Sequence, residues 1–482
     1  MTDSALITTL SPARRRIAFY VLLLGALLPA LNMFIVTIAL PAIRAGLDAS
    51  SSETGLIVSG YTSAFGVTLI TGGRLGDLFG RKRMFQIGMI SFTLMSLICG
   101  LSPNAEWLVV ARVFQGIAAA LMAPAVLAGV RTLFAAEEIA WAMNIYATGI
   151  GMAVAGGMFL GGVLMATDAW GLGWRTAFLI NVPIGLAAMA AAAFLVPESG
   201  GREKPRLDIG GVLLLSAALG SFVVSLSIGR EHHWAGWVFA LLGASPILLT
   251  AFFWYELRLT RRGGMPLLDA SLLEIESFRR GLLVALLFFF TTPFYLFFSL
   301  YLQAGLGEAA LSAGLAILPY GIANFIGPML ASRASARLRP YLFGLGMTLE
   351  IIGYGTVGLC TATQTGGIPL FLGLFTAGFG QGVAMPEMIN AILGDVPHAH
   401  TGLAAGIMTS TLQLGGALSV ALIGSLFFAV LGDGTSAADY GHALGASMAS
   451  QVVIFIAAML LGLRPAFARR RAARLASDRK AC

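Results

Sequence analysis

Fourteen apolar segments run through this chain, and each is long enough, or nearly so, to cross a lipid bilayer. An α-helix needs about 20 apolar residues for one crossing, whereas a transmembrane β-strand needs only about ten residues of alternating polarity. The runs are continuous, so we expect an all-α polytopic membrane protein. The segments are Ile17–Pro41, Thr54–Thr71, Met84–Leu101, Trp107–Val130, Ala140–Ala166, Phe178–Val196, Gly210–Ile228, Trp237–Trp254, Gly281–Leu302, Leu311–Leu330, Leu342–Thr361, Ile368–Leu393, Gly402–Leu431 and Leu444–Leu463.

Composition excludes a soluble globule and a disordered chain. Apolar residues make up 57% of the sequence and charged residues 11%, whereas soluble domains carry about 25% charged residues. Three cysteines, widely spaced, form neither a disulfide framework nor a metal site. The net charge of +7 is explained by the basic bias of cytoplasmic loops, so we expect no nucleic-acid partner.

Charge distribution predicts the topology. The basic flank Arg14-Arg-Arg16 precedes a 25-residue apolar run, too long for a signal peptide and suited to an uncleaved first helix. With the N-terminus inside, cytoplasmic segments hold 26 of the 30 Lys and Arg residues, and external loops hold three. This asymmetry predicts fourteen helices with both termini in the cytoplasm.

The linkers predict four regions. A six-helix bundle occupies residues 1–200, a two-helix insert with its linkers 201–262, a second six-helix bundle 263–465, and a basic cytoplasmic tail 466–482. The sequence that ends the second helix is weakly echoed where the tenth helix ends. Duplicated halves are typical of transporters with a central site reachable from either side of the membrane.

A glycine-rich charged motif, Gly73-Arg-Leu-Gly-Asp-Leu-Phe-Gly-Arg-Lys-Arg83, is predicted to form the loop between the second and third helices. Its glycines permit a tight turn and close helix approach. Asp77 can cap a helix N-terminus or pair with the neighbouring arginines. An ordinary basic loop would not require this pattern.

In this motif the chain resembles the major facilitator superfamily. Three further motifs, together with the fourteen spans, resemble its fourteen-helix drug:proton antiporters of the QacA/EmrB type: Ile38-Ala-Leu-Pro-Ala-Ile43, Leu108-Val-Val-Ala-Arg-Val-Phe-Gln-Gly-Ile-Ala-Ala-Ala120 and Trp174-Arg-Thr-Ala-Phe-Leu-Ile-Asn-Val-Pro-Ile-Gly185. The resemblance covers about Ala18 to Leu463.

The resemblance implies export of hydrophobic, often cationic, compounds by alternating access in exchange for protons. It places the chain in the cytoplasmic membrane of a bacterium, with substrates, protons and the bilayer as partners. The sequence does not determine the oligomeric state, and a monomer is the working assumption. It also implies that Arg74, Asp77 and Arg81 form a charged switch between the two halves that opens and closes during transport.

Three departures from the family pattern affect the expected mechanism. Asn32 stands where the family commonly has an acidic residue on the first helix, so it cannot carry a proton. Met158 stands in place of the usual proline on the fifth helix, and the echo near Ser332 lacks an acidic residue. The usual proton site and the usual kink are therefore not expected here.

Arg112 is the most constrained single residue, because a charge within the hydrocarbon costs about 2.5–3.5 kcal/mol on insertion scales. Its depth on the fourth helix is similar to that of Asn32 on the first. We assign Arg112, Asn32 and Gln115 to the substrate cavity, with Arg112 as a fixed charge that tunes substrate or proton binding. The alternative is a structural arginine held by Asn32 and backbone carbonyls.

Two acidic residues within apolar segments are the candidate proton carriers. Glu350 lies in the middle of the eleventh helix and Glu387 in the twelfth. Removal from water disfavours the charged form of a carboxyl group, so such a group can load and release a proton near neutral pH. Glu350 is the first candidate and Glu387 the second; for Glu387 a structural hydrogen bond is an equal alternative.

An aromatic run on the ninth helix adds Phe290, Phe294 and Tyr301 to the predicted cavity. Aromatic faces stack on flat substrates or attract organic cations. The alternative is a stripe that packs in the protein or faces lipid, and Pro293 is expected to kink this helix.

The sequence contains no phosphate-binding loop and no protease or lipase motif, so we expect neither an enzyme nor a cofactor or metal requirement. A carrier for a specific metabolite, without proton coupling, is the first alternative function. A non-transporting receptor or scaffold is the second. The substrate itself cannot be read from the sequence.

Overall fold

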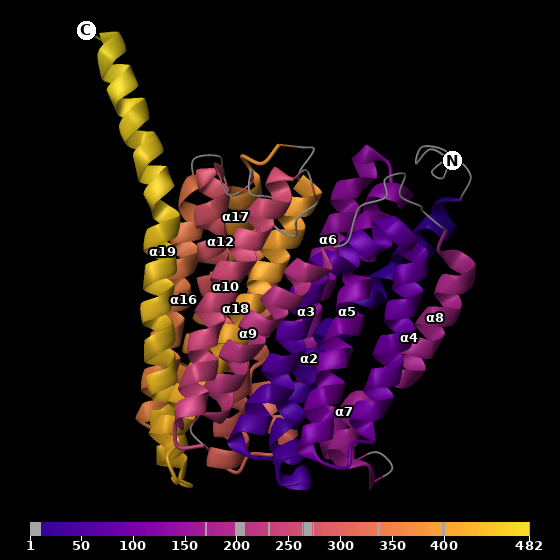
Figure 1. Ribbon diagram of the computed structural model, residues 1–482. Coiled ribbons are helices and arrows are strands. Elements are labelled where there is room, and N and C mark those ends of the chain that lie inside the picture. The colour runs from indigo at the N-terminus through magenta and orange to yellow at the C-terminus, as the bar shows by residue number, and fades with distance from the viewer. Residues whose placement is uncertain are drawn as a thin grey trace.

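A computed structural model describes residues 11–481 except 169–170, 198–207, 230–231, 263, 265–271, 273, 335–337 and 398–400. All regular structure in this described part is helical (Figure 1). The first helices are α2 (Pro12–Leu47), α3 (Ser51–Phe79), α4 (Arg81–Gly100), α5 (Ala105–Leu133) and α6 (Ala136–Thr167), followed by the short turns η2 (Gly173–Arg175) and α7 (Thr176–Leu179), and by α8 (Asn181–Leu195). We call α2–α8 the first bundle.

Two helices follow as an insert, α9 (Ile209–Ile228) and α10 (Gly236–Arg261). The second bundle consists of α12 (Glu276–Phe288), η3 (Phe289–Thr291), α13 (Thr292–Leu300), η4 (Tyr301–Gly305), α14 (Ala310–Ala316), α15 (Leu318–Ser332), α16 (Arg339–Ala362), α17 (Ile368–Leu393), α18 (Thr401–Leu431) and α19 (Ala437–Ala481). Twelve helical stretches in the described residues are long and apolar enough to cross a membrane. They coincide with twelve of the fourteen predicted segments; the second and fifth predicted segments are the helices α3 and α6.

Local sequence explains where the first helices begin. Ser11 accepts a hydrogen bond from the backbone of Arg14, and Pro12 occupies the first turn of α2, where its missing N–H costs nothing. Ser50 and Glu53 form a reciprocal capping box at the start of α3. These caps satisfy backbone groups that a helix end otherwise leaves unpaired.

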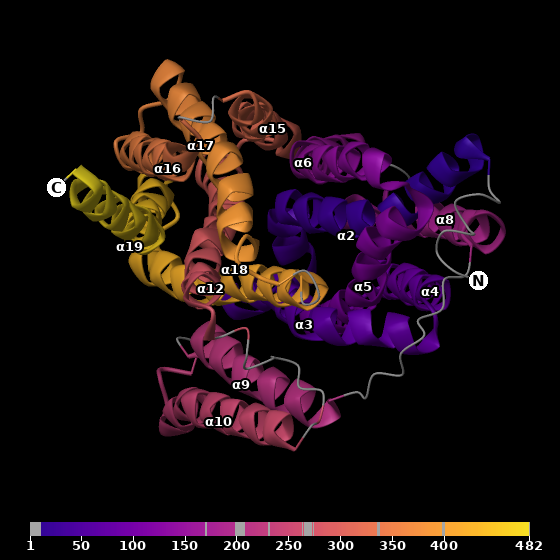
Figure 2. The same ribbon diagram turned by 90° about the horizontal axis from the view of Figure 1, so that it is seen from above.

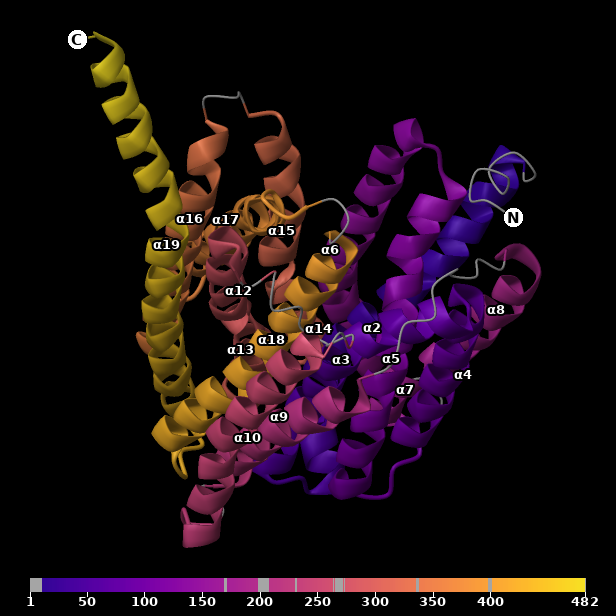
Figure 3. The same ribbon diagram turned by 45° about the horizontal axis from the view of Figure 1, so that its top comes forward.

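The ninth and tenth predicted helices are not straight. The predicted ninth helix is divided by one 3-10 turn, η3, just before Pro293, and it ends in the π-helical turn η4. Proline lacks the N–H needed to continue the ladder, and the α-helix is interrupted at the position where a kink is predicted (Figure 3 shows α12 and α13 in succession). The tenth helix breaks at Ile317, directly before Leu318 and Pro319, into α14 and α15.

The two bundles meet along two seams, seen from above in Figure 2. On one side α3 packs against α18, and on the other α6 packs against α14 and α15. Helix α9 lies over the first seam because it packs against both α3 and α18, and the Ser425 hydroxyl donates a 2.9 Å hydrogen bond to the Leu226 carbonyl. Helix α10 lies outside α9, at the edge of the molecule.

Candidate functional site

Arg112 is the centre of a buried polar cluster in the first bundle. Its side chain on α5 is fully buried. Its Nη1 donates hydrogen bonds of 2.7 Å to Asn32 Oδ1 on α2 and of 2.7 Å to Gln115 Oε1, and its Nε donates one of 3.0 Å to the Ile57 carbonyl on α3. The contact between Arg112 and Asn32 expected from their similar depths is therefore present. Three helices are joined by one guanidinium group.

The remaining contacts of this cluster are also with uncharged groups. The guanidinium carbon of Arg112 lies 4.0 Å from the centre of the Tyr61 ring. Gln115 Nε2 donates a 2.7 Å hydrogen bond to the Ser96 hydroxyl on α4. Among the described residues no carboxylate pairs with Arg112, and its Nη2 has no hydrogen-bond partner. The aromatic face and the neutral acceptors stabilise the buried charge without a counter-ion.

A second buried polar cluster lies in the second bundle and is centred on Gln381 of α17. Its Oε1 accepts hydrogen bonds of 2.6 Å from the Tyr320 hydroxyl and 2.6 Å from Asn324 Nδ2, both on α15, and one of 3.4 Å from the Tyr295 hydroxyl on α13. Thr291 extends the cluster, because its hydroxyl is hydrogen-bonded to those of Tyr320 and of Tyr354 on α16. Four helices thus meet through side-chain hydrogen bonds.

Glu350 of α16 lies beside this second cluster. Its side chain is fully buried, and neither carboxyl oxygen has a hydrogen-bond partner among the described residues. It is close enough to Tyr295, Tyr320 and Tyr354 for a charge on its carboxylate to act on all three hydroxyls. A buried carboxylate without partners is costly, so this environment favours the neutral, protonated form of Glu350.

Close helix packing sets the position of Glu350. At Gly380 of α17, an added Cβ would lie 2.3 Å from the Glu350 backbone nitrogen. Gly378 and Gly382 similarly approach the backbone of α15, at Tyr320 and Asn324. The Gly378–Gly382 repeat within an apolar helix therefore serves helix packing.

The other candidate acid, Glu387, is in a different environment. It lies half-buried on α17, six residues beyond Gln381, and the positive charge of Arg339 at the start of α16 acts on it. Glu387 is therefore partly solvated and lies within reach of a positive charge. Glu350 has neither feature.

The predicted aromatic stripe is buried and faces protein rather than lipid. Phe294 lies among Tyr295, Tyr320 and Tyr354, with ring centres 5.1–5.4 Å apart. Phe290 and Tyr301 are buried as well, but Phe290 contributes its backbone carbonyl to Gln451 on α19 and Tyr301 packs near Phe298. Of the three predicted cavity aromatics, only Phe294 joins the second polar cluster.

The predicted cavity residues thus fall into two separate groups. Asn32, Arg112 and Gln115 lie in the first bundle, whereas Phe294 lies in the second. The sequence analysis did not identify Tyr320, Tyr354 and Gln381 as members of a site. The one signal in the sequence is that each is a polar side chain within an apolar segment.

Direct contacts between the bundles include two near the end of the molecule where α2 ends, at the bottom of Figure 1. There Gln303 Nε2 donates a 3.0 Å hydrogen bond to the Ile38 carbonyl, and the α6 backbone at Gly162 approaches α14 so closely that an added Cβ would lie 2.9 Å from the Ala310 carbonyl oxygen. Nearer the middle, the rings of Phe34 and Tyr295 meet edge to face at 5.1 Å.

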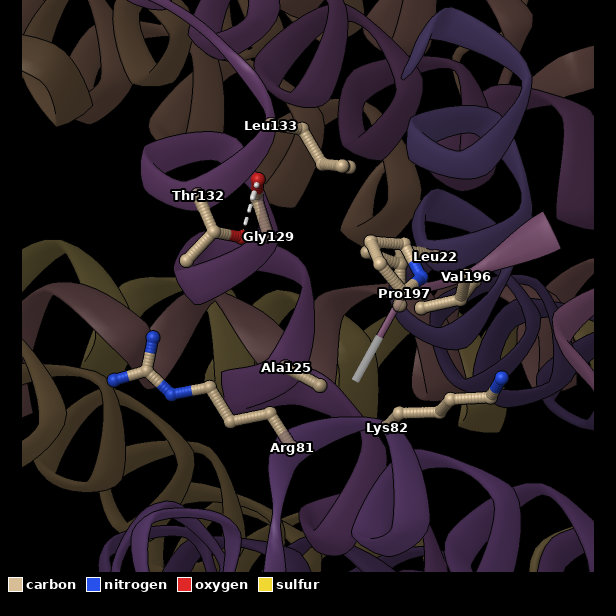
Figure 4. Close-up of a pocket in the computed structure, with 9 residues that line it drawn as sticks. All are labelled: Leu22, Arg81, Lys82, Ala125, Gly129, Thr132, Leu133, Val196 and Pro197. Atoms are coloured by element: carbon tan, nitrogen blue, oxygen red, sulfur yellow. Dashed lines mark hydrogen bonds between the residues drawn. The ribbon is translucent and has the colours of Figure 1, made fainter. Parts of the chain in front are cut away.

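The predicted switch segment differs from the expected loop. Helix α3 continues to Phe79, so Arg74 and Asp77 lie on a helix and only Gly80, with φ 94°, forms the turn before Arg81 begins α4. The helix can continue because residues 72–79 contain no proline to interrupt it. The side chains of Arg74 and Asp77 lie outside the described part of the structure. Arg81 and Lys82 border a small pocket with Leu22 and Pro197, shown in Figure 4.

Comparison with known proteins identifies the family. The sequence profile of the Major Facilitator Superfamily matches residues 22–420. The chain belongs to the major facilitator superfamily. A probable actinorhodin transporter of Streptomyces coelicolor is 37% identical over 436 residues, which cover 89% of this chain and 75% of that protein. The puromycin resistance protein pur8 of Streptomyces alboniger is 32% identical over 423 residues, covering 86% of this chain and 82% of that protein.

A solved structure shares the fold. The crystal structure of tetrameric PepTSo2 superposes with a TM-score of 0.66 at 17% identity, covering 95% of this chain and 99% of that chain. The superfamily is one of transporters, so the predicted class, a multi-pass membrane transporter of small molecules, is confirmed.

Proposed function

We propose that this protein exports hydrophobic small molecules, including organic cations, from a bacterial cell by alternating access. The observation that carries this proposal is the extended similarity to a probable actinorhodin transporter and to a puromycin resistance protein. A flat aromatic or cationic substrate is suited to the rings around Phe294 and to the hydroxyl and amide groups beside them.

The topology proposed for this function has fourteen spans and places both termini in the cytoplasm. Helices α3 and α6 contain 29 and 32 residues, about 44 and 48 Å at the α-helical rise, which is enough to cross a bilayer. Within the first bundle, α3 packs against α5 and α6 packs against α2. The start of α2 and the far end of α19 lie at the same end of the molecule in Figure 1, as an even number of crossings requires. The proposed regions are 1–200, 201–262, 263–465 and 466–482.

In this orientation the hydrogen bond from Gln303 to Ile38 and the close packing of Gly162 on Ala310 lie near the outer surface. The structure then corresponds to a state closed toward the outside. Transport requires these contacts to break while the two bundles rock on their seams, and Arg74, Asp77 and Arg81 are the proposed switch at the inner face.

We further assign proton coupling to Glu350, with Glu387 as the second candidate. Glu350 is neutral while it is buried without partners, and it can release its proton only when movement of the bundle admits water or a partner. Arg112 is proposed to act at a distance, as a fixed positive charge in the first bundle. The exchangeable proton is then carried in the second bundle. In the first bundle, Asn32 stands where the family commonly has an acidic residue.

Purified protein in proteoliposomes tests both claims. Uptake of dyes, organic cations and metabolites is measured with and without an imposed pH gradient, in wild type, in Glu350→Gln and in the matched control Glu308→Gln, which changes an exposed carboxylate. We expect Glu350→Gln to abolish gradient-driven accumulation but retain downhill exchange, and the control to behave as wild type. Unchanged gradient-driven transport in Glu350→Gln would exclude this carboxyl as the carrier. Transport of one metabolite alone would favour the specific-carrier alternative.

A further inference from the structure

The outer face of helix α10 carries two cationic side chains that nothing in the transport mechanism uses. Only 17% of the most apolar stretch of α10 is buried in the protein, the smallest share among the twelve spans. Ile247 and Trp254 are 70% and 60% exposed on this helix. In a membrane protein such a surface is in contact with lipid.

Trp254, Leu257, Arg258 and Arg261 line a hollow of about 300 Å³ at the C-terminal end of this helix. Their spacing of three and four residues places them along one face. The guanidinium carbon of Arg258 lies 5.1 Å from the centre of the Trp254 ring, so the aromatic ring holds the cation at the edge of the hollow. The hollow therefore has an apolar wall and a cationic rim.

The charges on this rim are not neutralised within the described part of the protein. Arg258 and Arg261 are exposed and form no ion pair with a described residue. The acidic side chain on the same turn, Glu256, is buried on the opposite face, where its carboxyl oxygen would lie 2.4 Å from a Cβ added at Gly211 of α9. The carboxyl group of Glu256 is thus directed toward α9 and away from the hollow.

We propose that this hollow binds the headgroup of an anionic phospholipid. Two guanidinium groups can donate hydrogen bonds to the phosphodiester and to any second negative charge, and Trp254 occupies the interfacial level that aromatic side chains prefer. The exposed apolar face toward Ile247 accommodates the acyl chains. A membrane lipid, rather than free phosphate, is the ligand, because the hollow lies on a face that is otherwise apolar and in contact with the bilayer.

Quenching of Trp254 fluorescence by brominated lipids tests this site. The intact protein is reconstituted in phosphatidylcholine vesicles that contain increasing fractions of brominated phosphatidylglycerol or of brominated phosphatidylcholine. The Trp254 signal is the difference between wild type and Trp254→Phe. A basic residue near an anionic surface contributes about 1 kcal/mol, so we expect brominated phosphatidylglycerol to reach half-maximal quenching at a fraction roughly fivefold lower for each arginine.

Variants separate a specific site from a general attraction to basic surfaces. Arg258→Gln combined with Arg261→Gln is expected to remove the preference for the anionic lipid, whereas Arg258→Lys retains most of it. Arg333→Gln, which removes an exposed charge at the end of α15, is the matched control and should leave the preference unchanged. Equal quenching by the two lipids in wild type, or a preference that persists in the double variant, would overturn the proposal.

Discussion

Substitution of Gly380 by alanine tests whether the close contact between α16 and α17 holds Glu350 in place. An added Cβ would lie 2.3 Å from the Glu350 nitrogen, 2.5 Å from the Gly346 carbonyl oxygen and 2.9 Å from the Glu350 Cα. All three atoms belong to the backbone, so no side chain can move aside. Ordinary contact begins at 3.4 Å, and the two helices must therefore separate by about 1 Å.

Overpacking of this kind typically costs about 1–3 kcal/mol, and the gain in helix propensity from glycine to alanine offsets up to about 1 kcal/mol. We therefore expect Gly380→Ala to lower the unfolding temperature of the purified protein in lipid nanodiscs and to weaken pH-driven transport. The matched control is Gly355→Ala on α16, where an added Cβ meets nothing within 4 Å, so stability should be unchanged or higher. Equal unfolding temperatures and transport rates in the two variants would refute the reasoning.

Three further substitutions address the polar contacts. Arg112→Lys keeps the charge but not the planar fork that reaches Asn32, Gln115 and the Ile57 carbonyl, so we expect a loss of roughly 2 kcal/mol or more, measured by thermal unfolding. Gln381→Leu removes the acceptor shared by three side chains and should cost about 1–3 kcal/mol in the same assay, whereas a stability equal to wild type would contradict a structural role for the cluster. Gln303→Leu breaks the hydrogen bond between the bundles and should increase labelling, by impermeant reagents from outside, of cysteines placed between the two bundles; unchanged labelling would show that this contact does not hold the outer side closed.

Much of the architecture follows from local sequence, because apolar length and capping act over short distances. The continuous apolar runs predict that the chain crosses the membrane as helices, and twelve of those runs coincide with described helices that are both long and apolar enough to do so. Pro293 directly follows the break in the ninth predicted helix, and its missing N–H is a local reason for that break, although Pro124 and Pro386 lie inside unbroken helices. The loop conformation predicted for residues 73–83 was wrong, because glycines permit a turn but do not impose one. Helix α3 continues through Arg74 and Asp77.

The sequence predicted members of the candidate site only where a residue is unusual for its segment, as an ionisable side chain is in an apolar run. Arg112 and Glu350 stand out because a charge in an apolar segment is costly wherever the helix packs. The chain by itself therefore determined the number of apolar segments, their helical form and the presence of these two ionisable side chains within them. Only the tertiary structure decided that Arg112 is surrounded by neutral partners in one bundle and that Glu350 lies unpartnered beside Gln381 and three tyrosines in the other. Such contacts depend on how each helix is rotated and how closely it approaches its neighbours, and those quantities are set by packing between segments far apart in the chain.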